Sequence, residues 1–350
     1  MIEQKERDGR IDFLKGVGIL LVIVGHLNCH PLIKSFIYLF HMPLFFIISG
    51  YLFDHRSSFR HFIKKKAATL LYPYFVFGGL YIVYEWLLAV KLNLECDVEF
   101  WRKHLFALVY GNYIFDNNAD YIGVLWFLIC LFWASLIYKC IVLVFSNSII
   151  MRFVVSIGMA ICGCITGKAL YAHGIRLPWC LDIAFPAVGG VATGDIFHCW
   201  IKRVNGSYIH SPRNGIIALF FGLVCGAANI FLIHRSGRGI RPDMLTENYG
   251  SAILFFTAST LLVFSLSSAT VMFYSHGKSC PFIERCGTLS MLIMIVHLKV
   301  LKIIEILSNY SQIRLNWIVL FALVFTGSYL IAILIERKMP FLIRWRKTKI

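Results

Sequence analysis

Ionisable side chains lie inside the apolar segments of this 350-residue chain, and the segment 11–29 holds three of them. Asp12, Lys15 and His26 fall at intervals that place them on one face of an α-helix. Lys15 and His26 would differ by only about 20° around the helix axis and by about 16 Å along it. Ionisable groups are costly inside a bilayer and mark functional sites by default. We therefore expect this face to turn toward protein or a cavity, not toward lipid.

Each of these side chains has a structural interpretation and a chemical one. Asp12 and Lys15 could form an interfacial pair at the entry of a helix, with the lysine amine reaching the headgroups. His26 lies roughly 21 Å beyond Asp12 along the helix. It is either a hydrogen-bonded core residue or a general base, because the unperturbed pKa of histidine is about 6.5. Three glycines of this segment allow another backbone or a ligand to approach closely: Gly16, Gly18 and Gly25.

Further candidates lie in three later segments. His41 comes just before Pro43, which removes a backbone donor and should kink or break its helix. Broken helices are tolerated in membranes where they line a cavity, so His41 is a second candidate imidazole. Asp182 and His297 each could be structural hydrogen-bond partners, and Asp182 could equally orient a histidine.

The composition determines which elements must position these residues. Apolar residues make up 59% of the chain and charged residues 15%, against about 45–50% and about 25% in soluble proteins. Uninterrupted apolar runs of about 20 residues recur from end to end, long enough for helices to cross a hydrocarbon core of about 30 Å. We predict an all-α, polytopic transmembrane bundle, with residues 1–350 forming a single domain. The ten predicted spans are 11–29, 36–53, 67–90, 121–145, 150–170, 179–200, 214–233, 249–272, 288–306 and 315–335.

The formal charge of +16 comes from basic residues in short loops between the apolar runs, which is typical of membrane topology and not of nucleic-acid binding. Lysines and arginines cluster at both termini and after the second span. Ten spans place these three regions on one side, so both termini are predicted to be cytoplasmic. The basic segment after the second span could also bind an anionic ligand. It contains Arg56, Arg60, Lys64, Lys65 and Lys66.

Two loops are predicted on the opposite side. The middle of loop 91–120, from Phe100 to Tyr110, is apolar enough to lie in the interface or re-enter the membrane. Loop 234–248 holds arginines against the charge rule, so these arginines are expected to have a function there. The eleven cysteines are scattered without zinc-ligand spacing, and we predict no metal site.

Two stretches resemble the acyltransferase-3 family of membrane acyltransferases, and more narrowly its bacterial fucose 4-O-acetylase-like branch. Residues 12–26 (DFLKGVGILLVIVGH) are similar to the family's opening helix, and residues 40–53 (FHMPLFFIISGYLF) to its second helix. Weaker matches follow in the same order along the whole chain: 71–74, 125–128, 248–250, and 287–290 leading to His297.

The resemblance implies O-acylation, usually O-acetylation, of sugar hydroxyls in cell-surface glycans by a multi-pass protein of the bacterial inner membrane. The family's catalytic signature is an arginine, ten intervening residues and a histidine. His26 is that histidine, and Lys15 stands at the arginine position without its planar fork. His26 would deprotonate the acceptor hydroxyl or take the acyl group first. Lys15 would stabilise the thioester oxyanion or only fix the donor, with Asp12 or Asp182 orienting a histidine.

The implied donor is cytoplasmic acyl-CoA, with acetyl-CoA favoured, and its phosphates would bind the basic segment described above. The implied partners are the lipid bilayer, a glycan acceptor and acyl-CoA; a homo-oligomer is left open. The alternative is a transporter or exporter of glycan or small solutes, which ten spans, a broken helix and intramembrane charge would also suit. A relative without activity is a third option, because Lys15 departs from the family pattern and Thr69 stands before the third span where a basic residue is common in the family. Binding of acyl-CoA distinguishes the enzyme from the transporter.

Overall fold

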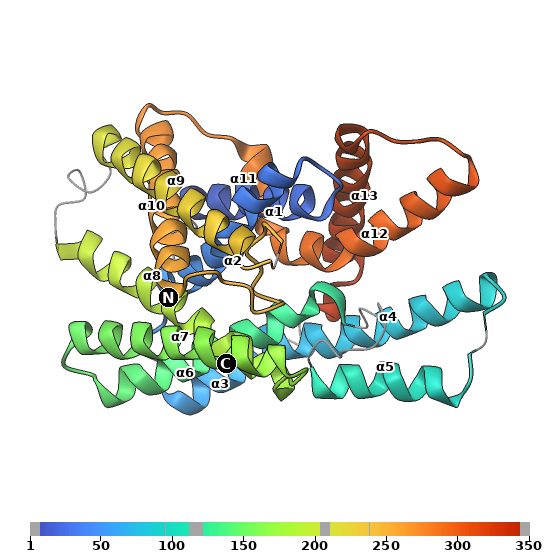
Figure 1. The fold of residues 1–350 in the computed structure, drawn as a ribbon, viewed down its shortest axis with the longest axis horizontal. Helices are drawn as coiled ribbons and strands as arrows, with labels where there is room; N and C mark the ends of the chain where they lie inside the picture. The colour runs from blue at the N-terminus through green and yellow to red at the C-terminus, as the bar shows by residue number, and fades with distance from the viewer. Residues whose placement is uncertain (1–7, 95, 112–121, 204–210, 238, 344–350) are drawn as a thin grey trace. The chain divides into compact units, whose positions relative to one another are not determined.

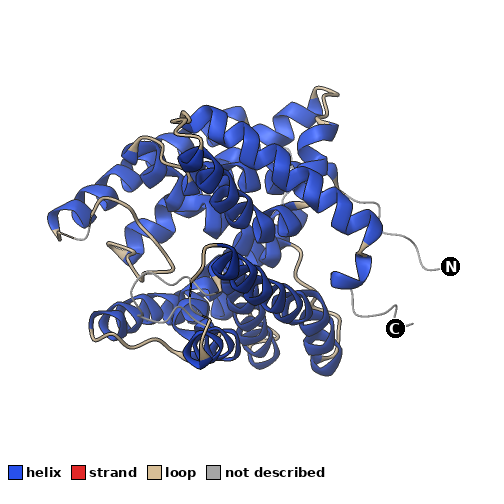
Figure 2. Cartoon of the chain, turned by 90° about the vertical axis from the view of Figure 1, so that its right-hand side faces the viewer, coloured by secondary structure: helices blue, strands red, loops and turns tan. Residues whose placement is uncertain are grey.

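The computed structural model describes residues 8–343 except 95, 112–121, 204–210 and 238. This part of the chain consists of helices and connecting loops, without a strand (Figure 2). The prediction of an all-α bundle is confirmed. The α-helices are α1 (Gly9–His26), α2 (Pro31–Tyr51), α3 (Phe59–Lys66), α4 (Tyr72–Lys91), α5 (Val98–Tyr110), α6 (Trp126–Val144), α7 (Ile149–Ala172), α8 (Leu181–Arg203), α9 (Pro212–Arg235), α10 (Ala252–Ser275), α11 (Pro281–Thr288), α12 (Ser290–Tyr310) and α13 (Trp317–Lys338). Short helical turns are η1 (Ala67–Leu71), a π-helix, and η2 (Gly123–Leu125), η3 (Pro178–Cys180) and η4 (Pro340–Leu342).

Eight helical segments among the described residues are long and apolar enough to cross a membrane, which agrees with a polytopic protein. Each of the ten predicted spans coincides with a long helix, and α1 and α12 are the two outside this group of eight. Both carry three charged residues within their length, which lowers their hydropathy. The segment 100–110, predicted to lie in the interface or to re-enter, falls in α5. The predicted cytoplasmic position of both termini stays a prediction.

Local signals explain where several helices begin. Four serines precede helices, and each side-chain oxygen accepts a hydrogen bond from a backbone N–H three residues later. A serine in this position satisfies one of the backbone donors that the first helical turn leaves without a partner. These serines are Ser58, Ser148, Ser211 and Ser251.

The chain forms two compact units. Unit 1 comprises Met1–Ile48, Phe197–Asp243 and Tyr249–Ile333; unit 2 comprises Ser49–Ile196, Met244–Asn248 and Leu334–Ile350. The single domain expected over 1–350 stays a prediction.

Within unit 1, glycines allow close helix packing. α9 and α10 lie side by side (Figure 1), and Gly215 and Gly222 of α9 face α10 residues such as Ser268 and Leu262. Small residues at such contacts let two helices approach within the bilayer, where lipid supplies no hydrophobic drive for association. α2, most of which belongs to this unit, runs on through Pro43, so the helix is not broken there, and the kink expected at this proline stays a prediction. Pro43 removes one hydrogen bond, and the rest of the long helix continues on both sides.

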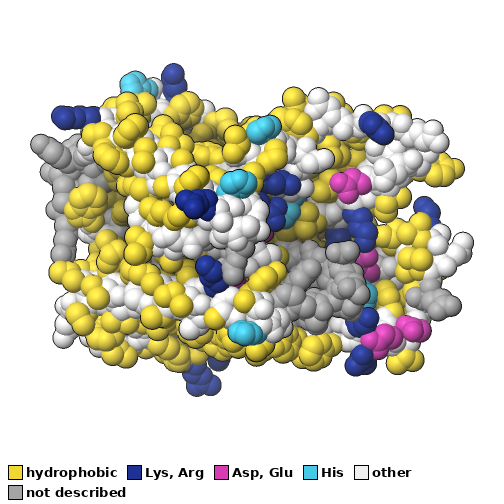
Figure 3. All heavy atoms as spheres, in the orientation of Figure 1, with side chains coloured by type: hydrophobic (Ala, Val, Ile, Leu, Met, Phe, Trp, Pro, Cys, Tyr) yellow, Lys and Arg dark blue, Asp and Glu magenta, His cyan; other side chains and the backbone are white. Residues whose placement is uncertain are grey.

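The outer surfaces of several helices are apolar, as the hydrophobic side chains in Figure 3 show. α7 exposes Ile150, Val154 and Ile165, and α9 exposes Ile216 and Phe220. A contiguous apolar surface of this kind is unsuited to water. These helix faces are suited to contact with lipid chains.

Candidate active site

The polar face of α1 is covered by protein at Asp12 and stays partly exposed at Lys15 and His26. Asp12 is 4% exposed, and Ile19 and Val22 on the same face are also buried. The Nζ atom of Lys15 lies 3.7 Å from Oδ1 of Asp12. Asp12 thus lies beside Lys15, about 21 Å along the helix from His26.

The predicted close approach of another backbone is confirmed at Gly16 of α1, and it comes from α11. A Cβ atom added to Gly16 would lie 2.1 Å from the backbone oxygen of Ile283. In return, a Cβ added to Gly287 of α11 would lie 1.7 Å from the backbone oxygen of Asp12. The two helices therefore touch backbone to backbone, which fixes the part of α1 that holds Lys15. At the other end of α1, Gly25 faces the ring of Tyr38.

Three histidines gather in unit 1. The ring of His26, in the last turn of α1, lies 5.1 Å from that of His297 on α12, measured between ring centroids. The centroid of the Tyr38 ring lies 6.4 Å from that of His26 and 4.7 Å from that of His41, so Tyr38 contacts both histidines. His41 and His297 are buried, whereas His26 is partly exposed. We call His26, His41, His297 and Tyr38 the histidine cluster.

Hydrogen bonds fix the tautomers of two of these imidazoles. Nδ1 of His41 lies 2.8 Å from the backbone oxygen of Ile37, and Nδ1 of His297 lies 2.6 Å from that of Met294. A carbonyl oxygen can only accept, so in each neutral ring Nδ1 carries the proton and Nε2 keeps a lone pair. The cluster therefore holds two buried nitrogen bases next to the more accessible His26.

An arginine of loop 234–248 contacts one ring of the cluster. The guanidinium of Arg241 lies 4.4 Å from the centroid of the Tyr38 ring, a distance typical of cation–π contact. Its Nη2 atom also lies 2.8 Å from Oδ2 of Asp243. One of the arginines that depart from the charge rule thus lies against Tyr38 of the histidine cluster. The function expected for these arginines stays a prediction.

Asp182, one of the two carboxylates considered for orienting a histidine, lies in unit 2. Its Oδ2 atom is 2.7 Å from Nε of Arg176, and both side chains are buried. It also accepts hydrogen bonds from the backbone N–H groups of Leu177 and Ile183. These contacts describe a buried ion pair at the start of α8, and the orienting role of Asp182 stays a prediction.

The basic segment proposed for the donor also lies in unit 2. Arg56, Arg60 and Lys64 are exposed and available to an anion. Lys65 pairs with Asp54 at 3.6 Å, and Lys66 reaches Ser49 at 3.4 Å. Partial burial alone would raise the pKa of Asp54, but the backbone N–H groups of Ser57 and Arg56 and the Lys65 charge lower it overall.

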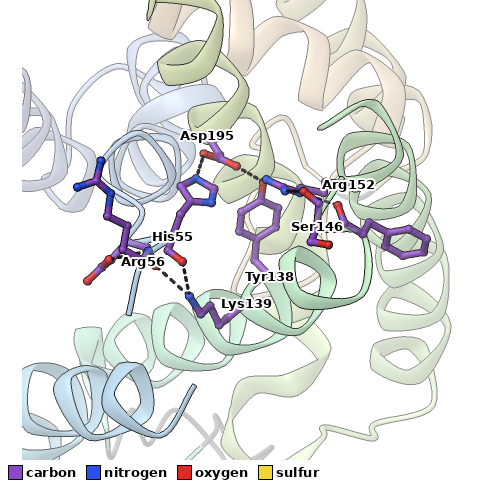
Figure 4. Close-up of polar contacts among 9 residues, drawn as sticks. His55, Arg56, Tyr138, Lys139, Ser146, Arg152 and Asp195 are labelled. Atoms are coloured by element: carbon purple, nitrogen blue, oxygen red, sulfur yellow. Dashed lines mark hydrogen bonds and ion pairs between the residues drawn. The ribbon is translucent and has the colours of Figure 1, made fainter. Parts of the chain in front are cut away.

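A cluster of polar side chains holds the loop that precedes the basic segment, and the sequence analysis did not predict this cluster (Figure 4). The buried carboxylate of Asp195 lies 2.6 Å from Nε2 of His55 and accepts the Tyr138 hydroxyl at 2.6 Å. Nζ of the buried Lys139 donates to the backbone oxygens of Asp54 and His55 at 3.1 and 3.2 Å. These contacts from α6 and α8 fix the chain just ahead of Arg56. The charges of Lys139 and Asp195 inside apolar runs were the available signal.

The sequence was compared with known protein families, curated proteins and solved structures. The family model Acyl_transf_3, described as "Acyltransferase domain", matches residues 8–337. This chain belongs to the acyltransferase-3 family. The match covers α1 with Lys15 and His26, the basic segment, and α12 with His297, so every group described above lies in the family's domain.

Curated relatives of this acyltransferase-3 chain match over shorter stretches. It is 35% identical over 146 residues to Nodulation protein NolL of Mesorhizobium japonicum, a match that covers 37% of this chain and 34% of the relative. It is 42% identical over 82 residues to Nodulation protein NolL of Sinorhizobium fredii, covering 19% of this chain and 22% of the relative. The matches thus span about a third or less of the length of these relatives. No solved structure matches the chain.

Proposed function

We propose that this chain is a membrane O-acyltransferase that moves an acetyl group from acyl-CoA to a sugar hydroxyl of a cell-surface glycan or its lipid-linked precursor. It would act as a multi-pass protein of the bacterial inner membrane with both termini in the cytoplasm. Membership of the acyltransferase-3 family supports acyl transfer. The observation that carries the proposal is the partly exposed His26, set beside two buried imidazoles in a family member.

The chemistry at this cluster needs one base and no redox step. His26 takes the proton of the acceptor hydroxyl as the oxygen attacks the thioester carbonyl carbon. The tetrahedral intermediate then collapses, the C–S bond breaks, and the CoA thiolate takes the proton back from His26. In an acyl-enzyme route, a His26 nitrogen attacks the carbonyl first, the C–S bond breaks, and CoA leaves as the thiol with the imidazole proton. The sugar oxygen then takes the acyl group, the N–acyl bond breaks, and the hydroxyl proton goes to His26.

The length of α1 separates the roles of its two polar residues. Lys15 and His26 lie on one uninterrupted helix and are about 16 Å apart along its axis. An oxyanion donor must lie about 2.7–3.1 Å from the developing charge. Lys15 is therefore too far away to stabilise an oxyanion formed at His26. Its proposed role is to fix the donor.

The donor's phosphates are proposed to bind the basic segment of unit 2. Arg56, Arg60 and Lys64 present exposed cations there, and the group around Lys139 holds the preceding loop in place. Arginine and lysine side chains on a fixed loop provide charge-assisted hydrogen bonds to phosphate oxygens.

The test uses the purified full chain in nanodiscs with acetyl-CoA labelled in the acetyl group. We expect the wild type to bind the label and to transfer it to a de-O-acetylated envelope polysaccharide extract. His26→Ala is expected to bind acetyl-CoA and to lose transfer by a factor of at least about 100. His276→Ala removes an exposed histidine of the same unit and serves as the matched control.

Three outcomes separate the possibilities. Full transfer by folded His26→Ala protein refutes the assignment of the base. Label that stays on the denatured wild-type protein without acceptor supports the acyl-enzyme route. Folded wild-type protein that binds no acetyl-CoA favours the transporter, which has no reason to bind this donor.

A further inference from the structure

One nitrogen atom of the histidine cluster, Nε2 of His297, takes no part in the proton transfer proposed for His26. His297 is fully buried, at 0% exposure, in the first half of α12. Its Nε2 atom is buried and has no hydrogen-bond partner among the described residues. Buried polar atoms in proteins are nearly always hydrogen-bonded, so an atom of this kind requires an explanation.

The protonation of Nε2 follows from the hydrogen bond that Nδ1 makes on the other side of the ring. Nδ1 donates its proton to the carbonyl of Met294 at 2.6 Å, one helical turn earlier. The neutral ring therefore directs a lone pair from Nε2, and it can accept a hydrogen bond there but cannot donate one. The helix backbone fixes this tautomer.

The nearest imidazole is that of His26, with ring centroids 5.1 Å apart. An imidazole N–H that donates to a second imidazole at about 2.9 Å between nitrogens places the two ring centres about 5 Å apart. The two rings therefore have the right separation for this bond, although Nε2 of His297 does not make it in the present arrangement. Catalytic hydrogen bonds are often misaligned without substrate and tighten when it binds.

We propose that His297 is a positioning residue whose Nε2 accepts the ring N–H of His26 and so directs the other nitrogen of His26 at the acceptor hydroxyl. This inference rests on the proposed function, because it assigns His26 as the base. A base that is oriented by a third group is the arrangement common to many nucleophilic and general-base sites. Asp12 and Asp182, the carboxylates considered from the sequence, contact Lys15 and Arg176.

The proton balance is simple in this arrangement. The hydroxyl proton moves to the free nitrogen of His26 and makes it an imidazolium. The positive ring then donates a stronger hydrogen bond to the lone pair of His297, which shares the charge. His297 forms no covalent bond and keeps its own proton on Nδ1, hydrogen-bonded to the carbonyl of Met294. The proton on His26 leaves with the CoA thiol.

The experiment measures kcat and KM for acetyl-CoA on the full chain in nanodiscs, with the de-O-acetylated polysaccharide extract as acceptor. His297→Leu is expected to lower kcat about 100-fold and to change KM for acetyl-CoA by less than about twofold. His297→Gln keeps an amide oxygen near the position of Nε2 and is expected to recover about tenfold of that loss. His297→Leu added to His26→Ala is expected to cause no further loss, because the two residues act as a unit.

A matched control is His104→Leu in unit 2. This buried histidine also bonds through Nδ1 to a carbonyl of its own helix, that of Phe100. It should lower thermal stability without the selective loss of kcat. Equal losses in His297→Leu and His297→Gln, or an additive loss with His26→Ala, would overturn the inference and leave the proposed function intact. A wild-type protein without acyl transfer overturns both.

Discussion

Replacement of Gly287 by alanine tests the backbone contact that positions the catalytic helix. The added Cβ would lie 1.7 Å from the backbone oxygen of Asp12, half of the 3.4 Å at which ordinary contact begins. The obstructing atom belongs to the backbone of α1, so it cannot rotate away. Overpacking costs about 1–3 kcal/mol where side chains can adjust. We expect about 3 kcal/mol or more here, and a fall in Tm of about 6–12 °C.

Two measurements follow this change. Thermal unfolding in detergent can be monitored with a thiol-reactive fluorophore, because several free cysteines are buried in the native fold. Mass spectrometry of alkylated Cys286, buried beside Gly287, reports separation of α1 and α11 at constant temperature. Gly287→Ala should speed alkylation of Cys286 and lower acyl transfer at least about tenfold, since Lys15 moves with α1.

The matched control is Gly158→Ala in α7, where a Cβ would meet nothing within 4 Å. Alanine stabilises a helix interior relative to glycine by roughly 0.5–1 kcal/mol, so this variant should keep or raise Tm. If Gly287→Ala is as stable as Gly158→Ala and protects Cys286 equally, α1 and α11 are not in backbone contact, and the reasoning is wrong.

Two further substitutions test the polar groups. Lys139→Met leaves the carbonyls of Asp54 and His55 without their donor, which should cost about 1–3 kcal/mol and lower Tm in the fluorophore assay. Lys278→Met, at an exposed lysine, is its control, and an equal Tm in both variants contradicts the role of Lys139. Lys15→Gln should raise KM for acetyl-CoA about tenfold with kcat nearly unchanged, and Lys15→Arg should retain the wild-type KM. A loss confined to kcat in steady-state assays would place Lys15 at the reacting carbonyl.

The helices could be predicted from sequence because long apolar runs leave the backbone no alternative inside lipid. The polar face of α1 was also predictable, since helical periodicity alone places Asp12, Ile19 and Val22 together. The same reasoning identified the glycines of α1 as contact points. It could not identify Ile283 as the partner, because this residue lies far along the chain.

The site was predictable only in part. His26 and His41 stand out as imidazoles in apolar segments, whereas the pairing of His26 with His297 depends on how α1 and α12 pack. The partners His55 and Asp195 are separated by 140 positions, and no local pattern joins them. Proline alone could not decide between a kink and a break in α2, because the residue-level rule does not include the support that a long helix gives on both sides; the structure shows that the helix continues.

The contact between Gly16 and Ile283 also sets a condition on how the chain is made. About 270 residues separate the two positions, and ribosomes add roughly 5–20 residues per second. Roughly 15–50 s therefore pass between the synthesis of α1 and that of α11, the helix that packs against its charged segment. During this interval a marginally apolar segment with Asp12 and Lys15 must remain in the membrane without its final neighbour. Correct insertion of α1 would then depend on translation speed and on factors that shelter polar helices until α11 emerges.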